Sequence, residues 1–110
     1  MTEGTIRVLI VDDHQVVRIG MRQLLASSAG FRVVGEAATA EEGVQIASQT
    51  RPDVVRMDVR RPAGTGVDAC RKIKAQDPEI RVVMLTSYSD EEAIVGAVMA
   101  GASGYLLKQA

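Results

Sequence analysis

The sequence predicts an α/β fold with a parallel five-stranded sheet in the flavodoxin-like strand order 2-1-3-4-5. Short apolar runs alternate with segments of helical periodicity, which is typical of parallel strands joined by crossover helices. Acidic or hydroxyl side chains follow several of these runs, as expected where buried strands end at one edge of a sheet. The chain has 110 residues, the size of a single domain, and we assign residues 1–110 to it.

Five short runs rich in β-branched and apolar residues are the predicted strands. In chain order they are Ile6–Val11, Phe31–Val34, Val54–Asp58, Ile80–Thr86 and Ser103–Lys108. The first run ends in two acids, Asp12 and Asp13, and the third ends in Asp58. Because ligands of such folds bind outside the carboxyl ends of the strands, we expect these acids to converge with Thr86 and Lys108.

Four helices are expected between the strands. Apolar residues spaced i, i+4, i+7 and i+8 predict the first helix over residues 15–27, with Arg18 and Arg22 facing solvent. Helix-capping patterns open the other three: Thr39 with Glu42, Thr65 with Asp68, and Ser89 with Glu92. Gly101 is expected to end the last of them.

Composition confines charge effects to local clusters. Thirteen Lys and Arg against fourteen Asp and Glu give a net charge of −1, so no global field attracts nucleic acid or acidic membrane. Cys70 is the only cysteine, which excludes a disulfide framework and fits a reducing cytosol. Neither a membrane span nor a signal peptide is recognisable. We expect a soluble cytoplasmic protein.

The expected cluster suits phosphoryl transfer assisted by Mg²⁺. This cation prefers oxygen ligands and keeps several waters, so Asp13, Asp58 and a backbone carbonyl would suffice to hold it. Without a cation, clustered carboxylates would repel one another and raise at least one pKa. With it, the Asp58 carboxylate can attack a phosphoryl donor, while Lys108 offers a charge and Thr86 a hydroxyl to the phosphoryl oxygens.

The chain resembles the receiver domain of two-component response regulators over nearly its whole length. The segments that carry the resemblance are Val11–His14, Met57–Pro62, Leu85–Ser87 and Gly101–Lys108. The first and last of them are most similar to the subfamily whose receivers precede a LuxR-type helix-turn-helix domain. The resemblance therefore implies a switch that normally controls transcription through a DNA-binding domain, which these 110 residues do not include.

The resemblance also implies a partner, a cofactor and a ligand set. A sensor histidine kinase would donate phosphate to Asp58. Mg²⁺ would be held by Asp12, Asp13, Asp58 and the backbone carbonyl of Arg60. A receiver of this kind assists only its own phosphorylation and dephosphorylation, so we do not expect an enzyme.

Switching and signal lifetime are assigned by the same resemblance. Thr86 and Tyr105 would couple phosphorylation to the surface around the fourth helix and fifth strand. Arg60 and Tyr88, two places after Asp58 and Thr86, would help set the lifetime of the acyl phosphate. Both are bulky and neither is an obvious base for activating water, so we expect slow self-dephosphorylation.

The sequence departs from the family pattern in three respects. Arg56 stands in a predicted central strand, where a charge is costly unless it reaches solvent, pairs with an acid or changes the packing. Arg61 replaces the usual Met or Leu. The chain stops after the fifth strand, without a fifth helix, so apolar surface on the first and fifth strands is expected to cause self-association, such as a homodimer, or rearrangement at that end.

Two other function classes share some features of this sequence. A hydrolase of the haloacid dehalogenase type would place a second Asp two residues after its nucleophile, and this chain has Arg60 there. A degenerate, phosphorylation-independent interaction module is favoured by Arg56 and Arg61 and disfavoured by the intact acids, Thr86 and Lys108. His14 is expected to be a local hydrogen-bonding residue at a helix start.

Overall fold

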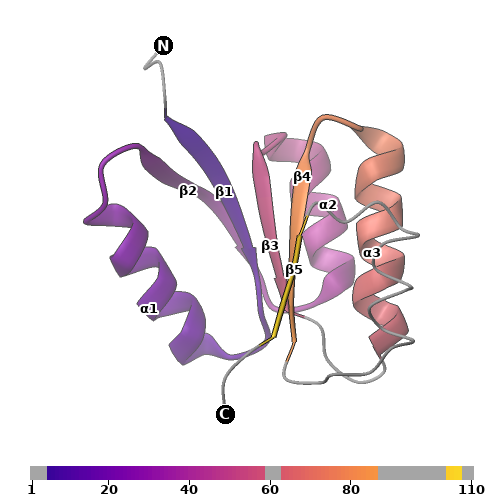
Figure 1. The fold of residues 1–110 in the computed structure, drawn as a ribbon, viewed down its shortest axis with the longest axis horizontal. Coiled ribbons are helices and arrows are strands. Elements are labelled where there is room, and N and C mark those ends of the chain that lie inside the picture. The colour runs from indigo at the N-terminus through magenta and orange to yellow at the C-terminus, as the bar shows by residue number, and fades with distance from the viewer. Residues whose placement is uncertain (1–4, 59–62, 87–103, 108–110) are drawn as a thin grey trace.

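The computed structural model describes residues 5–58, 63–86 and 104–107. The described elements are β1 (Ile6–Val11), α1 (Gln15–Ala26), β2 (Phe31–Ala37), α2 (Ala40–Thr50), β3 (Val54–Asp58), α3 (Ala63–Gln76), β4 (Arg81–Thr86) and β5 (Gly104–Leu107). The strands form one parallel sheet in the order β2-β1-β3-β4-β5 (Figure 1). The predicted fold class and strand order are confirmed.

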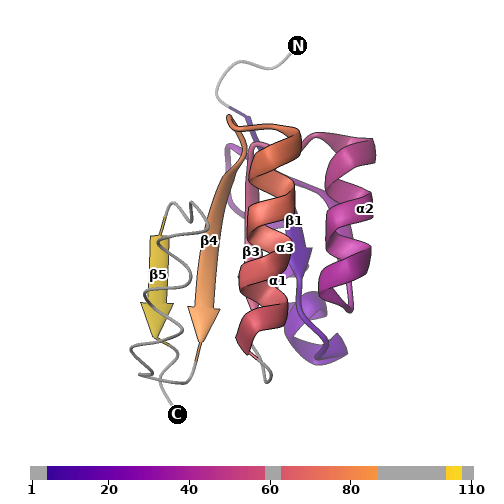
Figure 2. The ribbon, with the colours of Figure 1, turned by 90° about the vertical axis from the view of Figure 1, so that its right-hand side faces the viewer.

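The described helices lie on both faces of the sheet. In Figure 1 the strands are seen nearly edge-on, with α1 on one side and α2 and α3 on the other. Figure 2, turned by 90°, shows α3 and α2 side by side in front of the strands. None of the helices in the described ranges is long and apolar enough to cross a membrane.

The main apolar core lies between the sheet and the pair α2 and α3. Alternate strand residues supply one side of it: Leu9, Val11, Val55, Met57, Val82 and Met84. Small or compact side chains of the helices supply the other: Ala47, Ala69, Cys70 and Ile73. Burial of this cluster fixes which face each strand turns inward, because a slip of one residue would expose the whole set.

A local sequence signal accounts for the start of α2. The Thr39 hydroxyl accepts a hydrogen bond from the Glu42 N–H at 3.1 Å, which confirms the predicted cap of α2. The Glu42 carboxylate in turn accepts from the N–H of Ala38 at 2.9 Å, one residue before the cap. Two boundaries differ from prediction by more than one residue.

β2 continues to Ala37, beyond the predicted end at Val34. Its register against β1 shifts between Val8 and Leu9, as in a bulge, and pairing then resumes through Gly35. The helix α3 begins at Ala63, so the expected cap at Thr65 is wrong. Pro62 directly precedes this helix in the sequence, and the fixed φ of proline favours helix starts. The predictions for Ser89, Glu92 and Gly101 lie outside the described residues.

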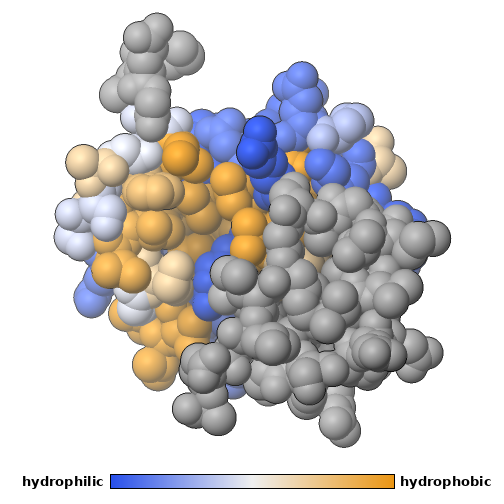
Figure 3. All heavy atoms as spheres, viewed as in Figure 1, coloured by the Kyte–Doolittle hydropathy of each residue, from blue (hydrophilic) through white to orange (hydrophobic). Residues whose placement is uncertain are grey.

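The other side of the sheet carries more exposed apolar surface. No residue of α1 is fully buried, and Val16 and Leu24 on this helix are 81% and 59% exposed. We define the apolar α1 surface as the exposed large apolar residues Ile6, Val16, Ile19, Leu24 and Phe31. Figure 3 shows hydrophobic residues gathered on the side of the molecule that carries α1. The expected exposure of β1 is wrong apart from Ile6, because Val8 and Ile10 are buried. The side chains of β5 lie outside the described residues.

We predict opposite effects on stability for alanine at two helical glycines. A Cβ added at Gly43 in α2 would lie 2.8 Å from Cγ2 of buried Val11, whereas a Cβ at Gly20 in α1 meets nothing within 4 Å. Gly20→Ala should stabilise by about 0.5–1 kcal/mol through helix propensity. Gly43→Ala should lose that gain to overpacking, which costs about 1–3 kcal/mol.

Urea unfolding of both variants measures the difference. A stabilised Gly43→Ala variant would contradict the close approach of α2 to β1.

We also predict that the Cys70 thiol is unreactive in the folded protein. Burial raises its pKa above the ordinary 9.0, and the opposing effect of the nearby Lys74 and Arg71 charges is smaller. Alkylation by iodoacetamide at pH 8 should be more than about tenfold slower in buffer than in urea, because the thiol reacts only after local opening. Equal rates in the two conditions would show that the packing of α3 against the sheet does not bury this thiol.

Candidate functional site

The carboxyl edge of the sheet gathers three of the predicted site residues by their backbone positions. Val11, the last residue of β1, pairs with Met57 on β3, so Asp12 directly after β1 and Asp58 at the end of β3 come next on neighbouring segments. Asp58 pairs with Leu85, and Thr86 is the last residue of β4. The predicted convergence is therefore confirmed for the backbone positions of Asp12, Asp58 and Thr86.

Other predicted site residues have less structural description. The side chains of Asp58, Thr86 and Tyr105 lie outside the described residues, although Tyr105 pairs through its backbone position with Met84 of β4. Arg60, Arg61, Tyr88 and Lys108 also lie outside them. Lys108 follows Leu107 in the sequence, and Leu107 pairs with Thr86 at the same edge of the sheet.

Asp12 is anchored by the end of β2 and by the close approach of α2. Its N–H donates to the carbonyl of Ala37 at 2.9 Å. The preceding residue, Val11, packs against Gly43, where the absence of a side chain lets the helix approach the strand. These two contacts hold the turn that carries both Asp12 and Asp13.

The Asp12 carboxylate is buried, and its two oxygens meet different partners. One oxygen, Oδ1, accepts from the His14 N–H at 2.8 Å and lies 2.9 Å from the His14 ring Nδ1. The other, Oδ2, lies 3.5 Å from a guanidinium nitrogen of Arg56. Asp12 is 1% exposed, so its carboxylate has lost its hydration. These contacts compensate for that loss.

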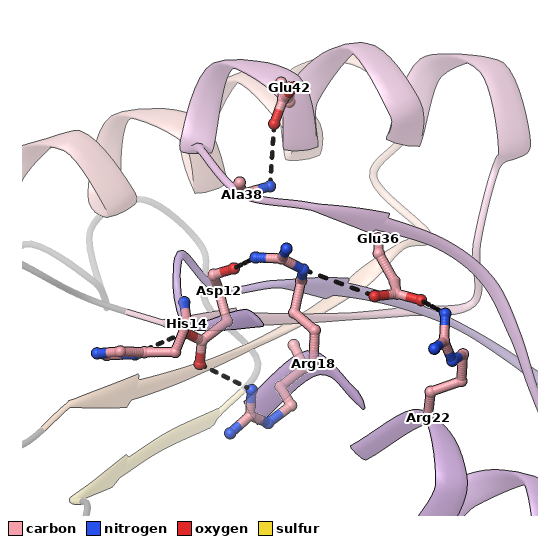
Figure 4. A network of polar contacts seen from close by, with 8 residues as sticks. Asp12, His14, Arg18, Arg22, Glu36, Ala38 and Glu42 are labelled. Carbon is pink, nitrogen blue, oxygen red and sulfur yellow. Dashed lines mark hydrogen bonds and ion pairs between the residues drawn. The ribbon is translucent and has the colours of Figure 1, made fainter. Parts of the chain in front are cut away.

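His14 belongs to this cluster as a helix-start residue. It occupies the N-cap position of α1, yet its side chain makes no capping hydrogen bond and lies beside the Asp12 carboxylate instead (Figure 4). Its Nδ1 is 3.4 Å from Oδ1 of Asp13 as well. The prediction that His14 is a local hydrogen-bonding residue at a helix start is confirmed.

The donor set fits Mg²⁺. Asp12, Asp13 and His14 each offer one ligand atom, and these atoms lie within 4.8 Å of one another. Two carboxylates are the hard oxygen ligands that Mg²⁺ prefers, whereas imidazole suits transition metals better. Asp13 is half exposed and leaves room for the waters that Mg²⁺ retains. The register adds Asp58 at the neighbouring strand end.

Arg18 contacts the backbone of Asp12, and the sequence did not predict this contact. Its NH1 donates to the Asp12 carbonyl at 2.6 Å, and its Nε lies 3.6 Å from Glu36 on β2. Arg22 pairs with the other oxygen of Glu36 at 2.8 Å (Figure 4). The expectation that Arg18 faces solvent is wrong, because only 18% of its side chain is exposed. The long stem carries the guanidinium to the end of β1.

The charge of Arg56 is compensated by an ion pair with Asp12. Its neighbours in register are Ile10 on β1 and Val83 on β4, so it stands in the middle of the sheet. Its side chain is 15% exposed and reaches Asp12 at the carboxyl edge. Among the outcomes open from the sequence, pairing with an acid is confirmed.

Sequence comparison connects the chain to one family. A model of the response regulator receiver domain matches residues 8–110. The DNA-binding transcriptional activator DevR/DosR of Mycobacterium tuberculosis is 44% identical over 103 residues, which are 94% of this chain and 48% of that protein. The chain spans about half the length of the curated relatives it matches.

Solved structures share the fold. A two-component response regulator of the LuxR family from Aurantimonas sp. SI85-9A1 superposes with a TM-score of 0.86 at 39% identity, over 96% of this chain and 76% of that one. A response regulator from Burkholderia pseudomallei, solved with a phosphorylated aspartic acid, calcium ion and citrate, has a TM-score of 0.82 at 25% identity, over 94% and 60% of the two chains.

Proposed function

The chain belongs to the response regulator receiver domain family, and on this premise we propose that it is a phosphoryl-accepting switch whose acceptor is Asp58. Receiver domains are signalling modules rather than classical enzymes. The observation that carries the proposal is the register of β1 and β3, which sets Asp58 beside the anchored Asp12. The phosphorylated aspartic acid in the Burkholderia relative supports the same chemistry.

Asp12, Asp13, Asp58 and the backbone carbonyl of Arg60 would hold Mg²⁺, the cation that receiver domains bind at their acidic pocket. When bound, Mg²⁺ neutralises charge on the phosphoryl oxygens. The protein itself holds these acidic residues in place before the cation binds. Asp12 contributes most to this, because its backbone is tied to Ala37 and its carboxylate to the His14 N–H.

The proposed transfer is an in-line displacement. A carboxylate oxygen of Asp58 forms a bond to the phosphorus of a phosphohistidine on a sensor histidine kinase, and the P–N bond breaks. The electron pair of the P–N bond stays on the imidazole nitrogen, and because the other ring nitrogen of the phosphohistidine carries a proton, the kinase histidine is left as a neutral imidazole. Thr86 donates a hydrogen bond and Lys108 a positive charge to the phosphoryl oxygens of the product.

Other residues of the chain would then relay the signal and set its lifetime. Thr86 and Tyr105 couple the acyl phosphate to the surface near β5. Arg60 and Tyr88 offer no water-activating base, so self-dephosphorylation is slow. Transcriptional control would act through a DNA-binding domain outside these 110 residues, as the DNA-binding relative suggests.

A second candidate function is a phosphorylation-independent interaction module. The observation that favours it is the ion pair between Arg56 and Asp12, which supplies the acidic pocket with a cation from the protein itself. The two functions differ in whether Asp58 takes up phosphate.

We expect acetyl phosphate with Mg²⁺ to add one phosphoryl group to the protein, as measured by intact-mass spectrometry. Asp58→Asn should lose the modification because an amide is not the required nucleophile, and EDTA should abolish it in the parent. Asp68→Asn, which changes an exposed acid on α3, is the matched control and should react normally. A parent protein that remains unmodified, or an Asp58→Asn variant that reacts equally, would favour the interaction module.

We further propose that the apolar α1 surface mediates self-association, since receiver domains often dimerise and this face exposes Val16 and Leu24. Leu24→Lys should lower the weight-average mass in sedimentation equilibrium at high concentration. Gln23→Lys adds the same charge at a neighbouring exposed position and should leave the mass unchanged. A parent protein that stays monomeric throughout would contradict the proposal.

A further inference from the structure

We propose that Arg56 is a built-in cation of the acidic pocket that competes with Mg²⁺ for Asp12 and so weakens its affinity. The inference rests on the proposed function, in which Asp12 holds Mg²⁺. It adds a residue to which that function assigns no role. It also explains how a central strand can carry an arginine at this position.

The geometry directs Arg56 to one oxygen of Asp12. A guanidinium nitrogen lies 3.5 Å from Oδ2, while Oδ1 is occupied by the His14 N–H at 2.8 Å. At 3.5 Å the contact lies at the long limit of a hydrogen bond, so attraction between the two charges dominates it. That attraction is little screened, because the side chain of Asp12 is 0% exposed and that of Arg56 only 15%.

The packing leaves Arg56 little choice of direction. Its register neighbours Ile10 and Val83 are apolar, and Ile10 is fully buried. A guanidinium cannot remain among such side chains without a counter-charge. The stem therefore runs along the strand and brings the charged head to the carboxyl edge, where Asp12 lies.

The same guanidinium has opposite effects on the two states of the pocket. In the metal-free protein it offsets the negative charge of Asp12 beside Asp13 and thereby stabilises the fold. A divalent cation that binds Asp12 must share Oδ2 with the guanidinium or displace it. In the bound state Arg56 is thus a nearby like charge, and its presence lowers Mg²⁺ affinity.

Isothermal titration with Mg²⁺ on the whole chain tests the proposal. Arg56→Met keeps the unbranched stem and removes the charge, and should tighten Mg²⁺ binding at least about tenfold, which is the effect that one unit charge several ångströms from a divalent ion has even in a water-like dielectric. Arg56→Gln should tighten Mg²⁺ binding similarly, and it replaces Arg56→Met in the test if the methionine variant does not fold. Arg56→Lys keeps the charge and should bind like the parent.

Arg81→Met is the matched control for net charge. Arg81 is exposed at the start of β4, at the end of the sheet opposite the acids, and its removal should leave Mg²⁺ affinity unchanged. Thermal unfolding gives a readout that a purely structural ion pair would not reproduce. Arg56→Met should melt below the parent in EDTA, and saturating Mg²⁺ should narrow or reverse that difference.

The outcomes separate this inference from the function on which it rests. Equal Mg²⁺ affinity in the parent and Arg56→Met would overturn the competition while the metal site stands. Tightening by Arg81→Met of the same size would overturn it in favour of a general charge effect. Absence of Mg²⁺ binding in the parent and in every variant would overturn both the inference and the proposed metal site.

Discussion

The parallel register of β1, β3 and β4 is the constraint on which the rest of the structure depends. Pairing of Val11 with Met57 and of Asp58 with Leu85 brings three strand ends to one level. The register is itself held by the alternating core residues that face α2 and α3. Hydrophobic burial on one face thus determines the position of polar residues at the edge, although those residues contribute nothing to the core.

At this edge the central difficulty is a buried charge. Asp12 is almost fully buried, and an unpaired carboxylate there would cost several kcal/mol, on the order of the stability of a small domain. The chain compensates it locally with the backbone and ring of His14 and at longer range with Arg56. Arg18 donates a hydrogen bond to the carbonyl of Asp12 and also pairs with Glu36 of β2. A site prepared in this way is organised before any ligand binds.

The sequence predicted those features that depend on local pattern. The bounds of β1 and β3, the strand order and the cap at Thr39 follow from apolar periodicity, topology and hydrogen-bonding chemistry. The site residues at the strand ends could be selected in the same way, because the carboxyl ends of parallel strands share an edge.

Features that depend on tertiary contacts could not be predicted. A helical wheel gives the direction of the Cβ of Arg18 but not the place that its long stem reaches, so its contact with Asp12 was missed. The continuation of β2 to Ala37 depends on a bulge in its pairing with β1. The sequence alone does not identify the partner of Arg56, because the strand register is what places Asp12 within its reach.

Paramagnetic broadening by Mn²⁺, which accepts the same carboxylate ligands as Mg²⁺, tests most directly whether one sheet edge assembles the site. In amide NMR spectra, the account predicts that low Mn²⁺ concentrations broaden the signals of Asp12, Asp13 and Asp58 first. The signals of Asp53 and Arg81, at the opposite end of the strands, should persist. Uniform broadening, or earlier loss at Asp53 and Arg81, would contradict a metal site at the carboxyl edge.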